Sequence, residues 1–138
     1  MIRVIADTGA IIALLDEDDK HHAAVVEVAQ SFDLLIPVTV IPEVDYLVTK
    51  YLGEAVVRSF LEAMTEGEFI YLPIEIEEIR RTTEIMARYS DIPIGFVDAS
   101  LVAIAESHNI HRILTLDRRH FNIIRPEGID YLELLPYQ

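Results

Sequence analysis

Short apolar segments with strand character alternate with longer segments of helical periodicity along the chain. Strands are expected over residues 2–6, 33–38, 68–72 and 111–116, with 129–132 as a candidate fifth, and helices over 8–15, 19–32, 41–51, 54–65, 75–90 and 98–108. The helices are indicated by apolar residues that recur at helical spacing. Strands that alternate with helices are typical of a parallel sheet covered by helices on both faces. The sequence therefore predicts an α/β fold with a central parallel sheet of four to five strands.

Length and composition are those of one globular domain. The chain has 138 residues, 51% of them hydrophobic, and it shows no linker, repeat or change of composition, so residues 1–138 are expected to form a single domain. The absence of cysteine excludes disulfides, thiolate zinc sites and a cysteine nucleophile. Its apolar runs are shorter than the roughly 20 residues of a membrane span, and its start lacks the features of a signal peptide. We therefore expect a cytoplasmic protein.

Four acidic residues stand where a predicted strand ends or a predicted helix begins. Asp7 follows the strand IRVIA, Asp117 follows RILTL, and Glu43 opens a helix. Each has a simpler interpretation: Asp7 as a helix N-cap, Glu43 as a first-turn residue favoured by the helix dipole, and Asp117 as a turn residue or ion-pair partner. Asp98 is harder to explain in this way, because it lies among apolar residues, where a charge is costly unless it is paired or bound to a metal.

Taken together, the four acids predict one site at one edge of the sheet. In open parallel sheets, binding sites form beyond the carboxyl ends of the strands, near the point where the strand order reverses. Carboxylates gathered there repel one another and hold raised pKa values unless a cation neutralises them. Oxygen ligands of this kind suit Mg²⁺ or Mn²⁺, and such ions assist phosphodiester hydrolysis. The residues alone thus indicate a carboxylate–metal pocket.

The segments that carry these acids resemble the PIN-domain nucleases of the VapC toxin type. The resemblance covers essentially the whole chain. Its most specific parts are IPIGFVDASLVAIA around Asp98 and ILTLDRRHF around Asp117. Two further parts complete the resemblance. One is the DTG that begins at Asp7, and the other is the isolated Glu43 on the helix after the second strand.

This resemblance implies a three-layer α/β/α sandwich and Mg²⁺- or Mn²⁺-dependent endonucleolytic cleavage of RNA. Asp7, Glu43, Asp98 and Asp117 would be the metal ligands and catalytic residues, and Thr8 and Thr115 would help to shape the site. The family also implies a cognate antitoxin protein and a homodimer. One departure from the family pattern is His120, which stands where relatives often carry a further acid, so a fifth ligand is not expected.

The formal net charge of −13 argues against a broad basic surface for nucleic acid. A bound metal would supply positive charge where the scissile phosphate sits. Arg118 and Arg119 lie directly beside Asp117 and are candidates for contacting substrate or shaping the site. Arg80, Arg81 and Arg112 are further arginines that could lie nearby, with ordinary surface solvation favoured for Arg80 and Arg81. The acidity also suits a basic protein partner.

Three rival interpretations fit parts of this sequence. DTGA is also an aspartic-protease signature, but that fold is all-β, and here the motif occurs once and runs into a helix. A receiver-type phosphoacceptor domain also places acids at strand ends, but Lys20 and Lys50 are the only lysines, and neither follows a late strand. The rival from another class is a binding protein that keeps the PIN fold without catalysis, and retention of all four acids argues against it.

Overall fold

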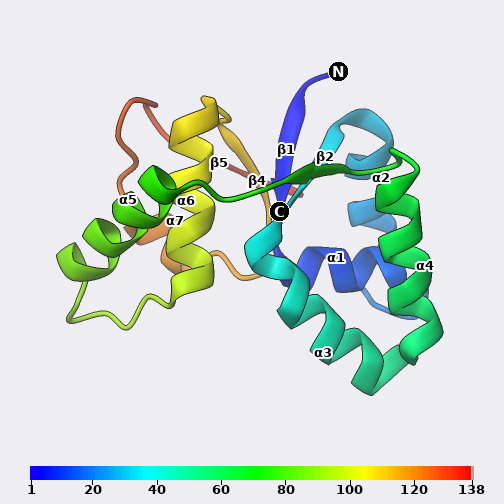
Figure 1. Ribbon diagram of the computed structural model, residues 1–138. Helices are drawn as coiled ribbons and strands as arrows, with labels where there is room; N and C mark the ends of the chain where they lie inside the picture. The colour runs from blue at the N-terminus through cyan, green and yellow to red at the C-terminus, as the bar shows by residue number, and fades with distance from the viewer. Residues whose placement is uncertain (138) are drawn as a thin grey trace.

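The computed structural model describes residues 1–137 and is built around one sheet of five parallel strands (Figure 1). The strands are β1 (Arg3–Ala6), β2 (Asp33–Pro37), β3 (Ile70–Leu72), β4 (Arg112–Leu114) and β5 (Glu133–Leu135). Their order across the sheet is β3-β2-β1-β4-β5, so the order reverses between β1 and β4. Because binding sites in such sheets form beyond the carboxyl ends of the strands at this reversal, the segments after β1 and β4 lie where a site is expected.

Helices cover both faces of the sheet. They are α1 (Thr8–Leu15), α2 (His22–Ser31), α3 (Ile41–Leu52), α4 (Glu54–Thr65), α5 (Ile76–Arg88), α6 (Phe96–His108) and α7 (Arg119–Ile123), with a 3₁₀ turn, η1 (Val38–Val40), before α3. Helices α1 to α4 form one layer, and α5 to α7 form the other (Figure 1). The predicted three-layer α/β/α sandwich with a parallel sheet is confirmed.

The core lies against the central strand and the helix that crosses it. Val4, Ile5 and Ala6 of β1 are fully buried, because β1 is paired on both edges and covered on both faces. Helix α6 is buried along seven successive residues, from Ala99 to Ala105. Its small side chains allow close packing against neighbouring elements. This packing fixes the start of α6, which carries Asp98 in its first turn.

Local sequence explains the helix boundaries near the site. Pro42 stands in the first turn of α3, where a missing N–H is tolerated. Gly53 separates α3 from α4 at a φ of 100°, a conformation that favours glycine. Asn109 ends α6 in the left-handed conformation at a φ of 53°. These signals agree with the helices that the sequence predicts.

The structure corrects several predicted boundaries. The fifth strand is Glu133–Leu135 instead of 129–132, because Leu134 and Leu135 are the residues that pair with β4 and enter the core. Helix α6 begins at Phe96 instead of residue 98, and α2 begins at His22 instead of residue 19, since residues 17–21 form turns. Helix α7 was not predicted at all.

Two of the arginines were also placed wrongly. Arg81 is not a solvated surface residue: its side chain is 18% exposed and donates to Glu106 through Nε (2.8 Å) and one terminal nitrogen (3.1 Å). Arg112 begins β4 at the amino end of the sheet, where it pairs with Glu133, so it lies away from the acids. Arg80 is exposed, as predicted.

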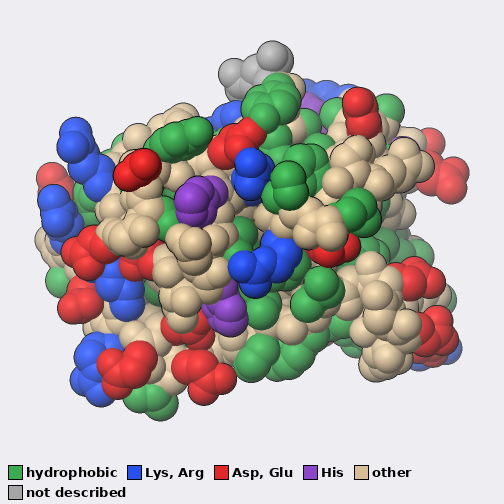
Figure 2. All heavy atoms as spheres, turned by 90° about the horizontal axis from the view of Figure 1, so that it is seen from above, with side chains coloured by type: hydrophobic (Ala, Val, Ile, Leu, Met, Phe, Trp, Pro, Cys, Tyr) green, Lys and Arg blue, Asp and Glu red, His purple; other side chains and the backbone are tan. Residues whose placement is uncertain are grey.

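The surface beyond the amino ends of the strands has mixed charge. Figure 2 shows this end of the molecule, where lysine or arginine side chains and histidine side chains lie among acidic and apolar ones and form no continuous basic surface. This agrees with the net charge of −13. Among residues 1–137, none of the helices has both the length and the apolar character needed to cross a membrane.

Candidate active site

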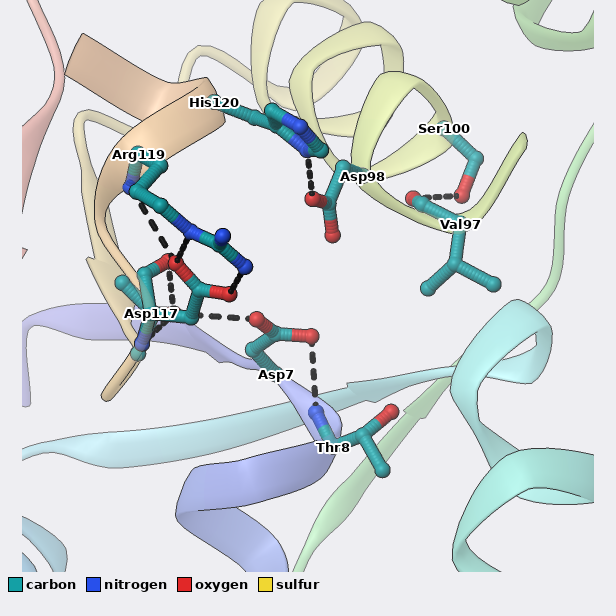
Figure 3. Close-up of polar contacts among 9 residues, drawn as sticks. Asp7, Thr8, Val97, Asp98, Ser100, Asp117, Arg119 and His120 are labelled. Atoms are coloured by element: carbon teal, nitrogen blue, oxygen red, sulfur yellow. Dashed lines mark hydrogen bonds and ion pairs between the residues drawn. The ribbon is translucent and has the colours of Figure 1, made fainter. Parts of the chain in front are cut away.

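Asp7 is the innermost of the four acids. It follows β1 directly and is 8% exposed. One carboxylate oxygen accepts the backbone N–H of Thr8 (2.8 Å), and the other accepts the hydroxyl of Thr115 (2.9 Å), as Figure 3 shows for Thr8. Its own backbone N–H donates to the carbonyl of Leu114 at the end of β4 (2.9 Å). The carboxylate is therefore fixed by both strands that flank the reversal of strand order.

The pKa of Asp7 is shifted by its burial and by the charges of other acids of the site. This pKa is raised from 3.8 to about 6, mainly by burial, because the charged form loses its contact with water. The negative charges of Asp98 and Glu43 contribute to this rise, while the hydrogen bonds from Thr8 and Thr115 oppose it. Three of the four predicted residues thus interact electrostatically at this edge of the sheet.

Asp98 reaches the site from the first turn of α6. Its Oδ2 lies 2.6 Å from Nδ1 of His120, which projects from α7 (Figure 3). Both side chains are about one quarter exposed, at 28% for Asp98 and 26% for His120. The costly charge among apolar neighbours is therefore paired with an imidazole, a contact that the sequence did not predict.

Asp117 lies after β4 at the more exposed edge of the site. Its two carboxylate oxygens accept Nε (2.9 Å) and one terminal nitrogen (2.7 Å) of Arg119 (Figure 3). These hydrogen bonds lower the pKa of Asp117 from 3.8 to about 2. The hydroxyl of Thr115 lies 3.0 Å from the carbonyl oxygen of Asp117, so one threonine touches both Asp7 and Asp117.

Glu43 stands in the first turn of α3 and is exposed. Among residues 1–137, its carboxylate has no hydrogen-bond or ion-pair partner. Its connection to the site is electrostatic, because its negative charge helps to raise the pKa of Asp7. Its placement matches the expectation of an acid on the helix after the second strand.

The four residues proposed to shape the site differ in position. Thr8 is buried, and its hydroxyl has no hydrogen-bond partner within the described chain. Thr115 bridges Asp7 and Asp117, and Arg119 pairs with Asp117. Arg118 turns away from the acids, because its guanidinium donates to the carbonyls of Leu134 (3.3 Å) and Pro136 at the end of β5.

The donor set fits a hard divalent cation, although its side chains are not gathered around one point. Within residues 1–137, no three acidic, histidine or cysteine side chains stand close enough to hold an ion as they are placed. The carboxylate of Asp98 is paired with His120, and the carboxylate of Asp117 is paired with Arg119. The oxygen-only donors, the raised pKa of Asp7 and the charges facing it are features that Mg²⁺ or Mn²⁺ would satisfy.

Comparison with known proteins shows the family. The PIN domain family matches residues 4–125, a range that contains all four acids. This chain is a PIN-domain protein. The PIN domain is 35% identical over 135 residues to Ribonuclease VapC26 of Mycobacterium tuberculosis (strain ATCC 25618 / H37Rv), covering 96% of this chain and 100% of the relative.

Solved structures share the PIN-domain fold. The Mycobacterium tuberculosis toxin VapC20, described as cleaving the sarcin–ricin loop, matches with a TM-score of 0.76 at 16% identity, over 83% of this chain and 90% of that chain. A toxin–antitoxin complex from Klebsiella pneumoniae matches with a TM-score of 0.69 at 18% identity, over 96% of each chain. At identities of 16% and 18%, these similarities show a shared fold and nothing more.

Sequence reasoning missed the contacts that α7 makes with the site. His120 attracted notice only as a departure from the family pattern, and its contact with Asp98 requires α6 and α7 to be adjacent. The only local signal was the position of Arg119 and His120 within three residues of Asp117. A five-residue helix has too short a pattern to be predicted from periodicity.

Proposed function

We propose that this PIN-domain protein is a metal-dependent endoribonuclease that serves as the toxin of a toxin–antitoxin pair. The observation that carries this proposal is the 35% identity to a VapC ribonuclease over 96% of the chain. The acidic site supports the same activity, because oxygen donors suit the divalent cations that assist phosphodiester hydrolysis. The substrate class comes from the relative, and the metal chemistry comes from the residues.

The proposed roles follow from the position of each acid. Asp7, Asp98 and Asp117 are the primary ligands for Mg²⁺ or Mn²⁺, and Glu43 holds an ion directly or through water. When bound, the ion supplies a more acidic water and neutralises charge that develops on the phosphate. Thr115 and the backbone N–H of Thr8 hold the carboxylate of Asp7 in one orientation. Such fixed orientation lowers the cost of ordering the ligand when the ion binds.

Partners and location are part of the proposal. Residues 1–138 would act as one domain and as a homodimer, and a cognate antitoxin would bind each toxin. Support for the antitoxin is the match to a toxin–antitoxin complex over 96% of the chain. The net charge of −13 suits a partner with basic segments. We propose a cytoplasmic location, because cellular RNA is available there as substrate.

The decisive experiment is an RNA cleavage assay with total bacterial RNA, in Mn²⁺ or in excess EDTA, with wild type and the Asp98→Asn variant. We expect cleavage by wild type in Mn²⁺ only, and a loss of at least about a hundredfold in the variant, because one ligand charge is removed. Asp91→Asn is the matched control, since Asp91 is an exposed acid in the loop before α6. Equal cleavage by wild type and Asp98→Asn, or cleavage that survives EDTA, would contradict the proposed mechanism.

The alternative is a PIN-fold binding protein without catalysis. It is favoured by one observation, the occupation of both Asp117 oxygens by Arg119. The same assay separates the two functions. A wild-type protein that is folded, binds Mn²⁺ and leaves every RNA intact would support the binding protein.

A further inference from the structure

The first turn of α7 places an arginine on one of the proposed ligands. Arg119 donates Nε to Oδ1 of Asp117 (2.9 Å) and a terminal nitrogen to Oδ2 (2.7 Å), so it engages both oxygens at once. Its backbone N–H also faces Oδ1, at 3.3 Å. Figure 3 shows the guanidinium lying across the carboxylate. Within residues 1–137, Arg119 is therefore the hydrogen-bond partner of both carboxylate oxygens of Asp117.

Arg119 also interacts electrostatically with a second proposed metal ligand, Asp98. The pKa of Arg119 is raised mainly by the hydrogen bonds and charge of Asp117, and additionally by the charge of Asp98. Since Asp98 and Asp117 come from different elements, the guanidinium lies in the field of acids on both sides of the site. A cation bound by these two acids would therefore compete with Arg119 for the same negative charge.

Breaking the ion pair between Arg119 and Asp117 would cost little free energy. The Arg119 side chain is 81% exposed and that of Asp117 is 59% exposed, and ion pairs exposed to this degree contribute little to stability. The guanidinium would remain near the site after release, because it is only two residues from Asp117 in the chain. A guanidinium can donate two parallel hydrogen bonds to a phosphate as readily as to a carboxylate.

We propose that Arg119 exchanges partners during the reaction cycle: it holds Asp117 before the divalent cation binds, and it releases Asp117 to contact the RNA phosphate when the cation is present. This inference rests on the proposed function. It assigns Arg119 two coupled effects, weaker cation binding and stronger substrate binding. Arg119 is thus a substrate-binding residue whose availability is set by metal occupancy.

The chain contains a matched control for this pair. Arg58 makes the same two-pronged contact with Glu54 on α4, at 2.9 Å and 3.0 Å, with side chains 62% and 66% exposed. The pair lies in the other helix layer and involves none of the proposed ligands (Figure 1). Any effect that arises merely from breaking an exposed ion pair should appear equally in Arg58→Ala.

The exchange is tested directly by NMR of the arginine Nε–H groups during a Mg²⁺ titration. The Arg119 signal, assigned by its loss in Arg119→Ala, should shift and exchange faster with water as Mg²⁺ binds, because its hydrogen bond to Asp117 breaks. The Arg58 signal should stay unchanged. An Arg119 signal that stays fixed at saturating Mg²⁺ would overturn the exchange and leave the proposed metal site intact.

Calorimetry with Mn²⁺ tests the competition. Arg119→Ala should bind Mn²⁺ about two- to fivefold more tightly than wild type, the range expected for removal of an exposed competing ion pair. Arg58→Ala should bind as wild type does. Unchanged or weaker binding by Arg119→Ala would overturn the exchange. Absence of Mn²⁺ binding by wild type would overturn the proposed function together with this inference.

Substrate binding is measured by fluorescence anisotropy with a labelled phosphorothioate oligoribonucleotide at saturating Mn²⁺. Arg119→Ala should bind the oligonucleotide at least about threefold more weakly, and Arg119→Lys should recover little, because lysine cannot make the two-pronged contact. Affinity equal to wild type in Arg119→Ala would overturn the contact with phosphate.

Discussion

Asp7 combines burial, fixed orientation and like-charged neighbours in one side chain. It is 8% exposed, both of its oxygens accept hydrogen bonds, and Asp98 and Glu43 raise its pKa. The sequence predicted its place at a strand end, because the run IRVIA stops there. It could not predict the contact with Thr115, because that residue lies 108 positions later. Such a contact depends on which strands become neighbours.

The raised pKa of Asp7 makes stability depend on pH in a definite direction. Its proton is bound more tightly in the folded protein, at a pKa of about 6 against 3.8, so its contribution is full below pH 3.8 and is lost as pH rises through 6. Asp7→Asn should therefore unfold at higher urea concentration than wild type at pH 8, by up to about 3 kcal/mol. The difference should shrink toward zero at pH 4.

Magnesium provides the control for this prediction. Added Mg²⁺ should stabilise wild type at pH 8 and leave Asp7→Asn nearly unchanged, because the variant lacks a primary ligand. A difference between the two proteins that is the same at pH 4 and pH 8 would show that the burial of the Asp7 charge is not its cause.

Thr115 offers a second prediction at the scale of single residues. Thr115→Val keeps the shape and removes the hydroxyl that donates to Asp7. We expect a loss of about 1–3 kcal/mol in stability and about 10- to 100-fold in RNA cleavage, since a buried carboxylate loses its partner. Thr82→Val is the control, because Thr82 is equally buried but its hydroxyl bonds within α5, to Glu78. Cleavage at wild-type rate by Thr115→Val would refute this role.

At the scale of helices and strands, elements with a long apolar pattern were predicted from the sequence, and elements with a short pattern were not. Helix α6 and strand β1 have enough apolar residues to be recognised, and their tertiary packing agrees with their pattern. Helix α7 has five residues, and its conformation follows from Phe121, which is buried in the core. Strand β5 shares an apolar stretch with the preceding loop, where Ile129 is buried without strand pairing. Only the pairing with β4 distinguishes strand β5 from the apolar loop that precedes it.

Helices α5 and α6 are joined by an ion pair whose strength can be tested. Arg81 and Glu106 are 18% and 10% exposed and make two hydrogen bonds. Arg81→Ala leaves Glu106 buried without its partner, so we expect a loss of roughly 3 kcal/mol in urea unfolding. Arg80→Ala, one residue earlier and 65% exposed, should change stability by less than about 0.5 kcal/mol. Equal effects of the two changes would contradict the importance of the buried pair.

For the whole molecule, strand–helix alternation was sufficient to predict the sheet and the edge that carries the acids. The rule that sites form at the carboxyl ends of parallel strands placed Asp7 and Asp117 correctly beside each other across β1 and β4. The contacts of Asp98 with His120 and of Asp117 with Arg119 were beyond prediction, because they depend on how α7 packs after β4. The sequence therefore predicts where the acids lie, and the structure adds what each of them touches.

The central position of β1 has a consequence for the timing of synthesis. Thr115, the partner of Asp7, is made 108 residues after it, which takes roughly 5–20 seconds at ordinary translation rates. Until then, β1 has one edge without its neighbour β4. A growing chain thus cannot complete the proposed nuclease while most of it is still being translated. The order of strands therefore keeps the proposed site incomplete until the segment that carries Thr115 and Asp117 has been made.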